Sequence, residues 1–176
     1  MAITKLQSES LNLADDYSFT GTITGAGGDN NPSFFAVSTS SEDGTAVSND
    51  TLTKMTFSTE VFDTDDCYDN STNYRFTPNV AGKYFVFTKA MADNLVANAT
   101  TKLEFYKNGS QMDDNYRMRI KNGSSPVGDV ENTLILSAII DMNGTSDYIE
   151  VYGTHNIGGN SSGLFDKHFG AYKIIT

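Results

Sequence analysis

The chain has 176 residues, of which 22 are acidic and 12 are basic, so its formal net charge at pH 7 is −10. This length suits one domain with a buried core plus an arm. The acidic balance argues against nucleic acid and anionic membranes as partners, because both attract clustered Lys and Arg. The three arginines form no stripe with aromatics interleaved in the sequence: Arg75, Arg117 and Arg119.

Residues 1–31 differ in character from the rest of the chain. Apolar side chains fall on odd positions and are followed by Gly and Asn; they are Leu11, Leu13, Tyr17, Phe19 and Ile23. A period of two predicts an extended segment with one apolar edge, and the Gly-rich stretch predicts a flexible link. The segment is either a strand packed on its own domain or an attachment arm that joins a sheet of another protein. The Gly-rich link favours the attachment arm.

Residues 32–176 are predicted to form an all-β domain. Runs rich in Phe, Tyr, Val, Ile and Thr alternate with turn signals such as EDGT, KNGS and MNGTS, and no segment keeps a helical period. Asn-Gly between such runs favours type I′ turns, and the spacing indicates a sandwich or barrel. The candidate strands are Pro32–Ser38, Lys54–Phe57, Asn73–Thr77, Gly82–Ala90, Thr101–Lys107, Tyr116–Lys121, Asn132–Asp141, Asp147–Tyr152 and Gly170–Ile175.

Two of these strands carry apolar side chains on both faces. In Gly82–Ala90, Tyr84 and Val86 point one way while Phe85 and Phe87 point the other. The run TLILSAIID repeats this pattern. Because a strand with one wet face alternates apolar with polar residues, the second face of both strands needs a partner. We expect copies of the chain to bury it jointly.

Several motifs occur in a defined order after residue 32. They are FFAVST, KMTFSTEVFDTDDCYDN, YRFTPNVAGKYFVF, KLEFYKNGSQ, TLILSAIIDMNGTSDYIEVYG and HFGAYKII. In this order they resemble the globular head of the complement component 1q and tumour necrosis factor superfamily. The matching positions are Phe76, Val80, Gly82, Tyr84 and Val86, then Lys107, Asn108 and Gly109, and finally Phe169, Gly170, Ala171 and Tyr172.

The resemblance implies a jelly-roll sandwich of about ten antiparallel strands that assembles as a homotrimer. It implies that one face of Gly82–Ala90 closes the sandwich while the other meets neighbouring copies at a threefold axis, which the last strand also lines. The implied trimer-interface residues are Phe85, Phe87, Phe169 and Tyr172.

The opening residues ITKLQSESLNLADDYSFTGTITGAGG resemble the start of fibre and virion proteins of marine tailed phages. No collagen-like Gly-X-Y repeat and no apolar signal region are present, so complement and cytokine roles are not expected. The resemblance implies a non-enzymatic virion protein, either a tail fibre or a capsid decoration protein, whose head stabilises the particle or contacts the host surface. The alternatives are a free lectin-like module that recognises a carbohydrate or receptor, and a hydrolase.

Catalytic chemistry has little support in the residue pattern. His155 and His168, expected at a loop start and just before the last strand, are the two bases for neutral pH. Ser161 and Ser162 lack the motif of a nucleophile elbow. The lone Cys67 lies among carboxylates that should raise its pKa. We therefore expect no catalytic residues, although no pattern of acids decides for or against a sugar-cleaving pair.

The stretch DTDDCYDN holds four carboxylates of the kind that calcium binds: Asp63, Asp65, Asp66 and Asp69. It departs from an EF-hand loop, because Cys67 occupies the third ligand slot, Tyr68 the glycine and Tyr74 the glutamate. We expect a solvated acidic turn and no metal or cofactor, with calcium as the open alternative.

The chain has no Trp, and most of its nine Tyr and eleven Phe fall on predicted strands, where core or interface is expected. Tyr148 and Tyr152 are the candidates for contact with a sugar.

Overall fold

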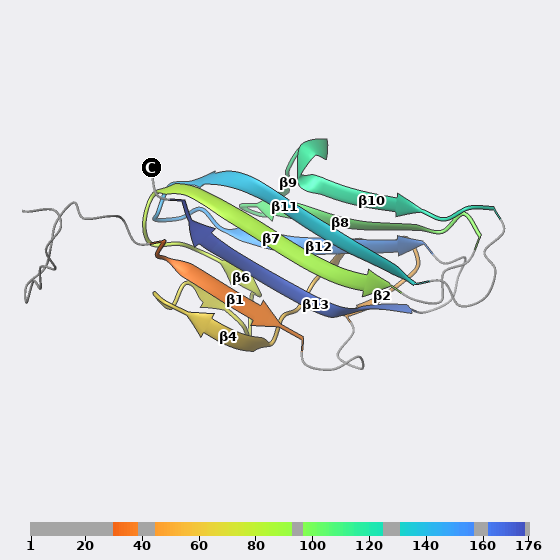
Figure 1. Ribbon diagram of the computed structural model, residues 1–176, viewed down its shortest axis with the longest axis horizontal. Helices are drawn as coiled ribbons and strands as arrows, with labels where there is room; N and C mark the ends of the chain where they lie inside the picture. Colours follow the sequence, from red (N-terminus) through yellow and green to blue (C-terminus); the bar gives the residue numbers. More distant parts are fainter. Residues whose placement is uncertain (1–29, 39–44, 93–96, 125–130, 157–161, 175–176) are drawn as a thin grey trace, which may run out of the picture.

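The computed structural model describes residues 30–38, 45–92, 97–124, 131–156 and 162–174 (Figure 1). The predicted attachment arm, including Leu11, Leu13, Tyr17, Phe19 and Ile23, lies outside the described residues, and so does Ser161. Among the described residues, no helix has the length and hydropathy needed to cross a bilayer.

The described residues form two antiparallel sheets that face each other (Figure 1). Sheet I has the order β11 (Asn132–Met142), β7 (Gly82–Ala92), β13 (Ser162–Lys173), β1 (Ser33–Val37) and β4 (Thr59–Asp63), with β2 (Thr45–Val47) beside β13. Sheet II has the order β10 (Arg117–Lys121), β8 (Thr100–Lys107), β12 (Ile149–Asn156), β6 (Arg75–Phe76) and β5 (Tyr68–Asp69), with β3 (Thr53–Lys54) beside β12 and β9 (Ser110–Gln111) beside β8. A short 3-10 helix, η2 (Asp114–Tyr116), precedes β10. The predicted all-β sandwich is confirmed.

The hairpin between β8 and β9 shows how local sequence sets the turns. Asn108 and Gly109 occupy its two central positions with φ of 54° and 74°. A two-residue type I′ turn requires positive φ at both positions, and Asn and Gly tolerate that region at the least steric cost. The predicted turn chemistry is therefore confirmed here.

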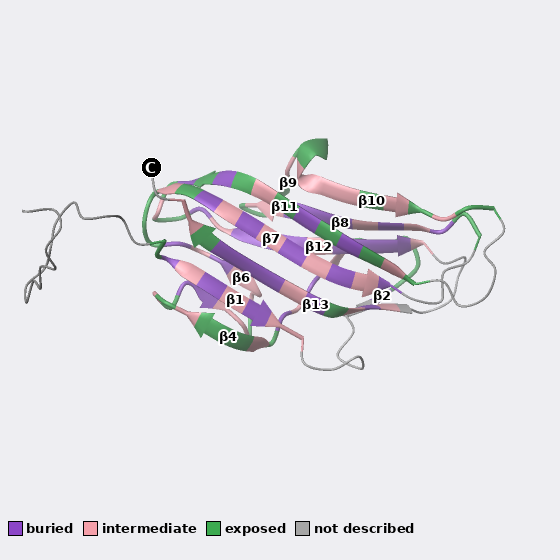
Figure 2. Ribbon diagram, in the orientation of Figure 1, coloured by how far each residue is buried: buried purple, intermediate pink, exposed green. Residues whose placement is uncertain are grey.

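The core lies between the sheets and is rich in stacked aromatic rings. Phe34 stacks on Tyr68 and on Phe76, with centroid separations of 4.5 and 4.6 Å, and its ring meets Phe169 edge-on at 4.9 Å. These rings come from β1, β5, β6 and β13, so the core joins segments far apart in the chain. Figure 2 shows the result as alternating buried and less buried positions along β7 and β11.

The last strand is longer than predicted. It begins at Ser162, not at Gly170, and its pairing with β7 shifts register between Phe165 and His168. This β-bulge, where Asp166 has a φ of 45°, interrupts the apolar alternation that reveals a strand in sequence. His168 consequently lies inside β13, and His155 likewise lies inside β12 and not at a loop start.

Candidate self-association surface

The outer face of sheet I carries a continuous group of apolar side chains, which we call the apolar band. Its members alternate with core residues on the same strands and extend from one edge strand to the other. They are Phe62 on β4, Phe35 on β1, Tyr172 on β13, Phe85 and Phe87 on β7, and Ile135 and Ile139 on β11.

The strand register places these side chains side by side. Phe35 pairs with Phe62 on β4, and Phe85 pairs with Tyr172 on one side and with Ile139 on the other. The rings follow the same path, with centroid separations of 6.5 Å for Phe35–Phe62, 6.1 Å for Phe35–Phe87, 5.9 Å for Phe87–Phe85 and 5.4 Å for Phe85–Tyr172. The rings and Ile139 thus form one connected surface, and Ile135 lies on the same face of β11, opposite Lys89.

A glycine allows the middle of the band to lie flat. Gly170 pairs with both Phe35 and Phe87, and a Cβ added to it would lie 2.5 Å from Cζ of Phe87. The Phe87 ring therefore occupies the space above this glycine. Any larger residue at position 170 has to displace the ring.

The band is only partly covered by its own chain. Ile135, Ile139 and Phe62 are 65%, 56% and 48% exposed, and Tyr172 is 38% exposed, while Phe85 and Phe87 are half-buried. Connected apolar surfaces of this kind mark sites that another molecule covers. The geometry fits burial against another apolar surface.

The predicted interface residues divide into two groups. Phe85, Phe87 and Tyr172 face outward within the apolar band. Phe169 does not: its side chain is fully buried between the sheets against Phe34 and Phe57, so assigning it to an interface was wrong.

The sequence prediction missed two members of the band, Phe35 and Phe62. Phe35 follows the core residue Phe34, so the alternation of faces along a strand was a usable signal for it. Phe62 lies in EVFDTDD, where the charges around it hid the short edge strand β4.

His168 is the titratable group inside the band. Its ring lies 5.4 Å from Phe35 and 5.9 Å from Phe87 between ring centroids, and its strand position pairs with Lys89. Burial, together with the neighbouring Lys89 charge, lowers the pKa of His168 from its ordinary value. The neutral imidazole is therefore the form that suits this surface.

The acidic stretch between Asp63 and Asp69 uses its carboxylates to organise the chain. Asp69 accepts backbone hydrogen bonds from Ser71, Thr72 and Asn73, which hold its pKa well below the usual range. Asp63 accepts from the backbone N–H of Tyr68 at 2.6 Å. Within the described residues no group of three or more His, Cys, Asp or Glu is placed to hold a metal ion.

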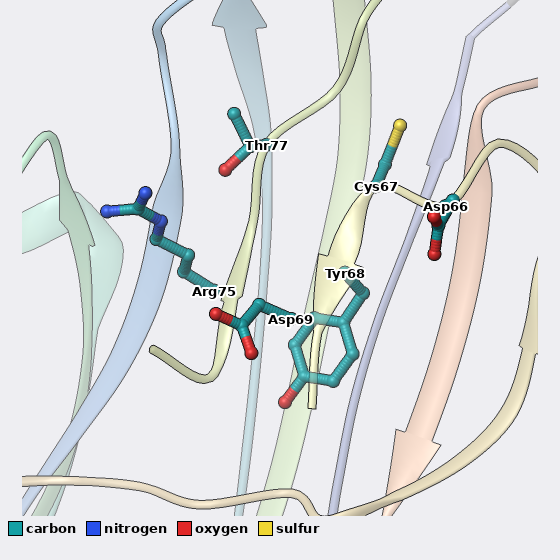
Figure 3. Close-up of a pocket in the computed structure, with 6 residues that line it drawn as sticks. All are labelled: Asp66, Cys67, Tyr68, Asp69, Arg75 and Thr77. Atoms are coloured by element: carbon teal, nitrogen blue, oxygen red, sulfur yellow. The ribbon is translucent and has the colours of Figure 1, made fainter. Parts of the chain in front are cut away.

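A pocket of about 350 Å³ lies next to this stretch (Figure 3). Its lining residues come from β5, β6 and their flanks: Asp66, Cys67, Tyr68, Asp69, Arg75 and Thr77. Burial, together with the nearby Asp63, Asp65 and Asp66, raises the pKa of the Cys67 thiol, in the predicted direction. A protonated, buried thiol is a poor nucleophile.

The two histidines do not form one site. His155 is fully buried on the inner face of sheet II, where its Nδ1 lies 2.8 Å from the Thr101 hydroxyl. His168 lies on the outer face of sheet I.

Comparison with known proteins identifies the fold. No family model and no curated protein matches the sequence. Among solved structures, the globular domain of zebrafish complement 1qA protein matches with a TM-score of 0.58 and 15% identity, over 81% of this chain and 96% of that chain. Crystal structures of murine APRIL at pH 5.0 and pH 8.5 match with TM-scores of 0.54 and 0.53, each at 12% identity over 81% of this chain and 98% of that chain.

At these levels of sequence identity, the matches show the fold and nothing more specific. The two-sheet topology and the matches together show that the chain has the complement 1q/tumour necrosis factor-like jelly-roll fold.

Proposed function

We propose that this chain is a non-enzymatic structural protein of a bacteriophage virion, a homotrimeric fibre or decoration protein attached to the capsid or tail. Residues 1–31 form the attachment arm, and the jelly-roll head stabilises the particle or contacts the host surface. The fold, which is consistent with a trimeric structural or recognition module, supports the assembly part of this proposal.

The observation that carries the proposal is the apolar band. A connected row of rings flanked by Ile135 and Ile139 lies on the outer face of sheet I. Burying apolar surface is favourable by roughly 25 cal/mol per Å², so copies that cover this face gain free energy at each contact. In the trimer, each copy contributes its own band to a shared interface.

Assembly also accounts for recognition without catalytic chemistry. When the three heads of one trimer contact the same surface, avidity makes the overall binding stronger than that of a single weak contact. No new kind of contact is needed for this gain. The arm supplies the link to the particle, since its alternating apolar edge suits addition to a sheet edge of another protein.

Light scattering coupled to size exclusion tests the assembly. The full chain has a mass of 19.1 kDa, and we expect the measured particle mass to be three times that value. A stable monomer at micromolar concentration contradicts the proposal.

A deletion separates the arm from the head. Removing residues 1–24 is expected to leave the trimer intact and to abolish binding to isolated capsids or tails in a co-sedimentation assay. Binding that survives the deletion would show that the head, and not the arm, attaches the protein.

A further inference from the structure

The outer face of sheet II differs from that of sheet I because it is polar and locally basic. On β10, Met118 and Ile120 pack against the core, so Arg117, Arg119 and Lys121 project outward on the opposite face.

The strand register brings two cations directly opposite each other. Arg119 of β10 pairs with Lys102 of β8, and neither forms an ion pair with a described residue. Like charges directly opposite across antiparallel strands are destabilising. In a chain with 22 acidic and 12 basic residues, this local excess of positive charge stands out. An anionic partner would relieve the repulsion.

Two tyrosines form an aromatic surface beside these cations. The rings of Tyr106 and Tyr152 lie 4.3 Å apart between centroids, and Tyr152 pairs in register with both Glu104 and Lys54. Both tyrosines remain partly exposed. Tyr152 was one of the two candidates for sugar contact in the sequence.

Two buried carboxylates complete the surface. Glu104 and Glu150 are each only 4% exposed, although they lie on the outer face of the sheet. Glu150 accepts a hydrogen bond from Lys54, while Glu104 accepts one from Gln111 at 3.2 Å and faces Arg117 at 3.6 Å. These pairs hold fixed acceptor oxygens next to the tyrosine rings.

We propose that the outer face of sheet II binds an acidic polysaccharide. A carboxylate or sulfate group of the sugar is held by Lys102 and Arg119, and a sugar ring stacks on Tyr152. The buried carboxylates of Glu104 and Glu150 hold the side chains of Arg117 and Lys54 in place beside this site.

The same residues disfavour a nucleic acid on this face. A nucleic acid strand carries a negative charge at every phosphate, and the fixed carboxylates of Glu104 and Glu150 would repel it. An acidic polysaccharide carries uncharged hydroxyl groups between its acidic groups. Its acidic groups can therefore lie next to Lys102 and Arg119, while uncharged parts of the sugar lie next to the carboxylates.

This inference goes beyond the proposed assembly. The site lies on the sheet opposite the apolar band and is built from one chain, so a monomeric head retains it and a trimer displays three copies.

The test measures binding by isothermal titration calorimetry with four probes of matched length: galacturonate oligosaccharides, sulfated dextran oligosaccharides, neutral dextran oligosaccharides and single-stranded DNA. We expect binding to at least one of the two acidic saccharides, weaker at high salt because exposed charges are screened, and none to neutral dextran. Whether the uronate or the sulfated probe binds identifies the acidic group that is recognised.

The double variant Lys102→Gln/Arg119→Gln removes the two opposed cations and is expected to weaken acidic saccharide binding roughly tenfold or more, a change of about 1.4 kcal/mol or more. The matched control Lys83→Gln/Lys173→Gln removes the same charge from sheet I and is expected to bind like the unaltered chain. Because the variant removes a repulsion, its melting temperature should equal or exceed that of the unaltered chain.

Three results would overturn the assignment: no binding to either acidic saccharide, an equal loss of binding in both double variants, or tighter binding to single-stranded DNA than to the acidic saccharides. None of these depends on whether the chain is a trimer, which light scattering reports separately.

Discussion

The two outer faces of this sandwich follow the same strand periodicity but present opposite chemistry. On sheet I the outward positions hold rings and isoleucines, such as Phe85, Phe87 and Ile139. On sheet II the corresponding positions hold ion pairs, tyrosines and two cations, Lys102 and Arg119, that form no ion pair with a described residue. Both sheets pack their inner faces into one core, so the fold alone does not distinguish them. The outward residues determine what each face can bind.

The energetics of the two faces differ in the same way. Apolar burial is worth roughly 25 cal/mol per Å² and requires no matched geometry at each atom, so the apolar band can hold copies together. A contact between exposed charges contributes only about 0–1 kcal/mol, so the cations Lys102 and Arg119 are suited to selective and reversible contact with a ligand. We therefore propose that sheet I serves assembly and sheet II serves recognition.

The most direct way to break the comparison is to place a charge on the apolar band. Ile139→Glu puts a carboxylate at a position that is 56% exposed in the single chain and buried in the proposed trimer. Because burying an unpaired charge is costly, the measured mass should fall from three times 19.1 kDa to 19.1 kDa.

The matched control is Lys121→Glu on the exposed outer face of sheet II. It places a carboxylate on the other face, with a charge change of two units where Ile139→Glu changes one, and should still leave the mass unchanged. Dissociation by both variants, or by neither, would contradict the separation of the two faces.

The next test separates the core from the band within one strand. Phe169 and Tyr172 lie on β13, but Phe169 is fully buried whereas Tyr172 is 38% exposed. In the monomeric Ile139→Glu background, Phe169→Ala should lower the free energy of unfolding by about 3–5 kcal/mol. Tyr172→Ala should cost much less, because its ring is already half in water.

Urea denaturation of both variants checks this prediction. Equal losses of stability would contradict the burial of Phe169 in the core and would favour its predicted place in the trimer interface.

Strand periodicity could have prevented the error over Phe169. Side chains alternate between faces at every residue, so Phe169 and Tyr172, three positions apart, point to opposite faces of a regular strand. The resemblance implied that both belong to the interface, because the last strand of that fold lines the threefold axis. Counting faces from the outward Tyr172 places Gly170 on its side and Phe169 in the core, as the structure shows.

Other features were beyond the reach of a pattern in sequence. The doubly apolar alternation of β7 and β11 predicted their outward apolar side chains, because both strands are long and regular. The bulge in β13 interrupts the alternation, and the short edge strand β4 dilutes it. The part of β13 before Gly170 and the residue Phe62 were therefore missed. The Arg119–Lys102 pair depends on cross-strand register, which no local pattern contains.

Two glycines allow a smaller and more selective perturbation. Gly170→Ala places a Cβ against the Phe87 ring, whose free side can move outward. We expect little change in the stability of the single chain and a clear rise in the trimer dissociation constant, measured by sedimentation equilibrium. The ring would no longer lie flat in the band.

Gly153→Ala is the matched change on the inner face. Its Cβ would meet Leu164 at 2.5 Å and Met55 at 2.7 Å within the core. Overpacking a core costs typically about 1–3 kcal/mol, so this variant should lower the unfolding free energy of the single chain. A reversal of the two outcomes would mean that the band is not an interface.

The smallest expected effect is a pH dependence of stability that arises from His168 on the outer face of sheet I. Burial, and then Lys89, lowers the folded-state pKa of His168 below the ordinary value of 6.5. Between these two pKa values the unfolded chain binds more protons than the folded chain, so stability rises with pH across that window. The contribution is complete above about pH 6.5 and is lost as the pH falls through the lower folded-state pKa.

His168→Gln should therefore flatten the dependence of melting temperature on pH between about pH 7.5 and 5.5. The difference between the two slopes of melting temperature against pH gives the contribution of His168, since the other histidine, His155, is present in both proteins. If the trimer buries the band further, the flattening should be greater for the trimer than for the Ile139→Glu monomer, because removal from water disfavours the charged imidazole. If the trimers of His168→Gln and of the unaltered chain show the same slope of melting temperature against pH, His168 lies outside the buried interface. The buried part of the apolar band would then be restricted to the rings around Phe85.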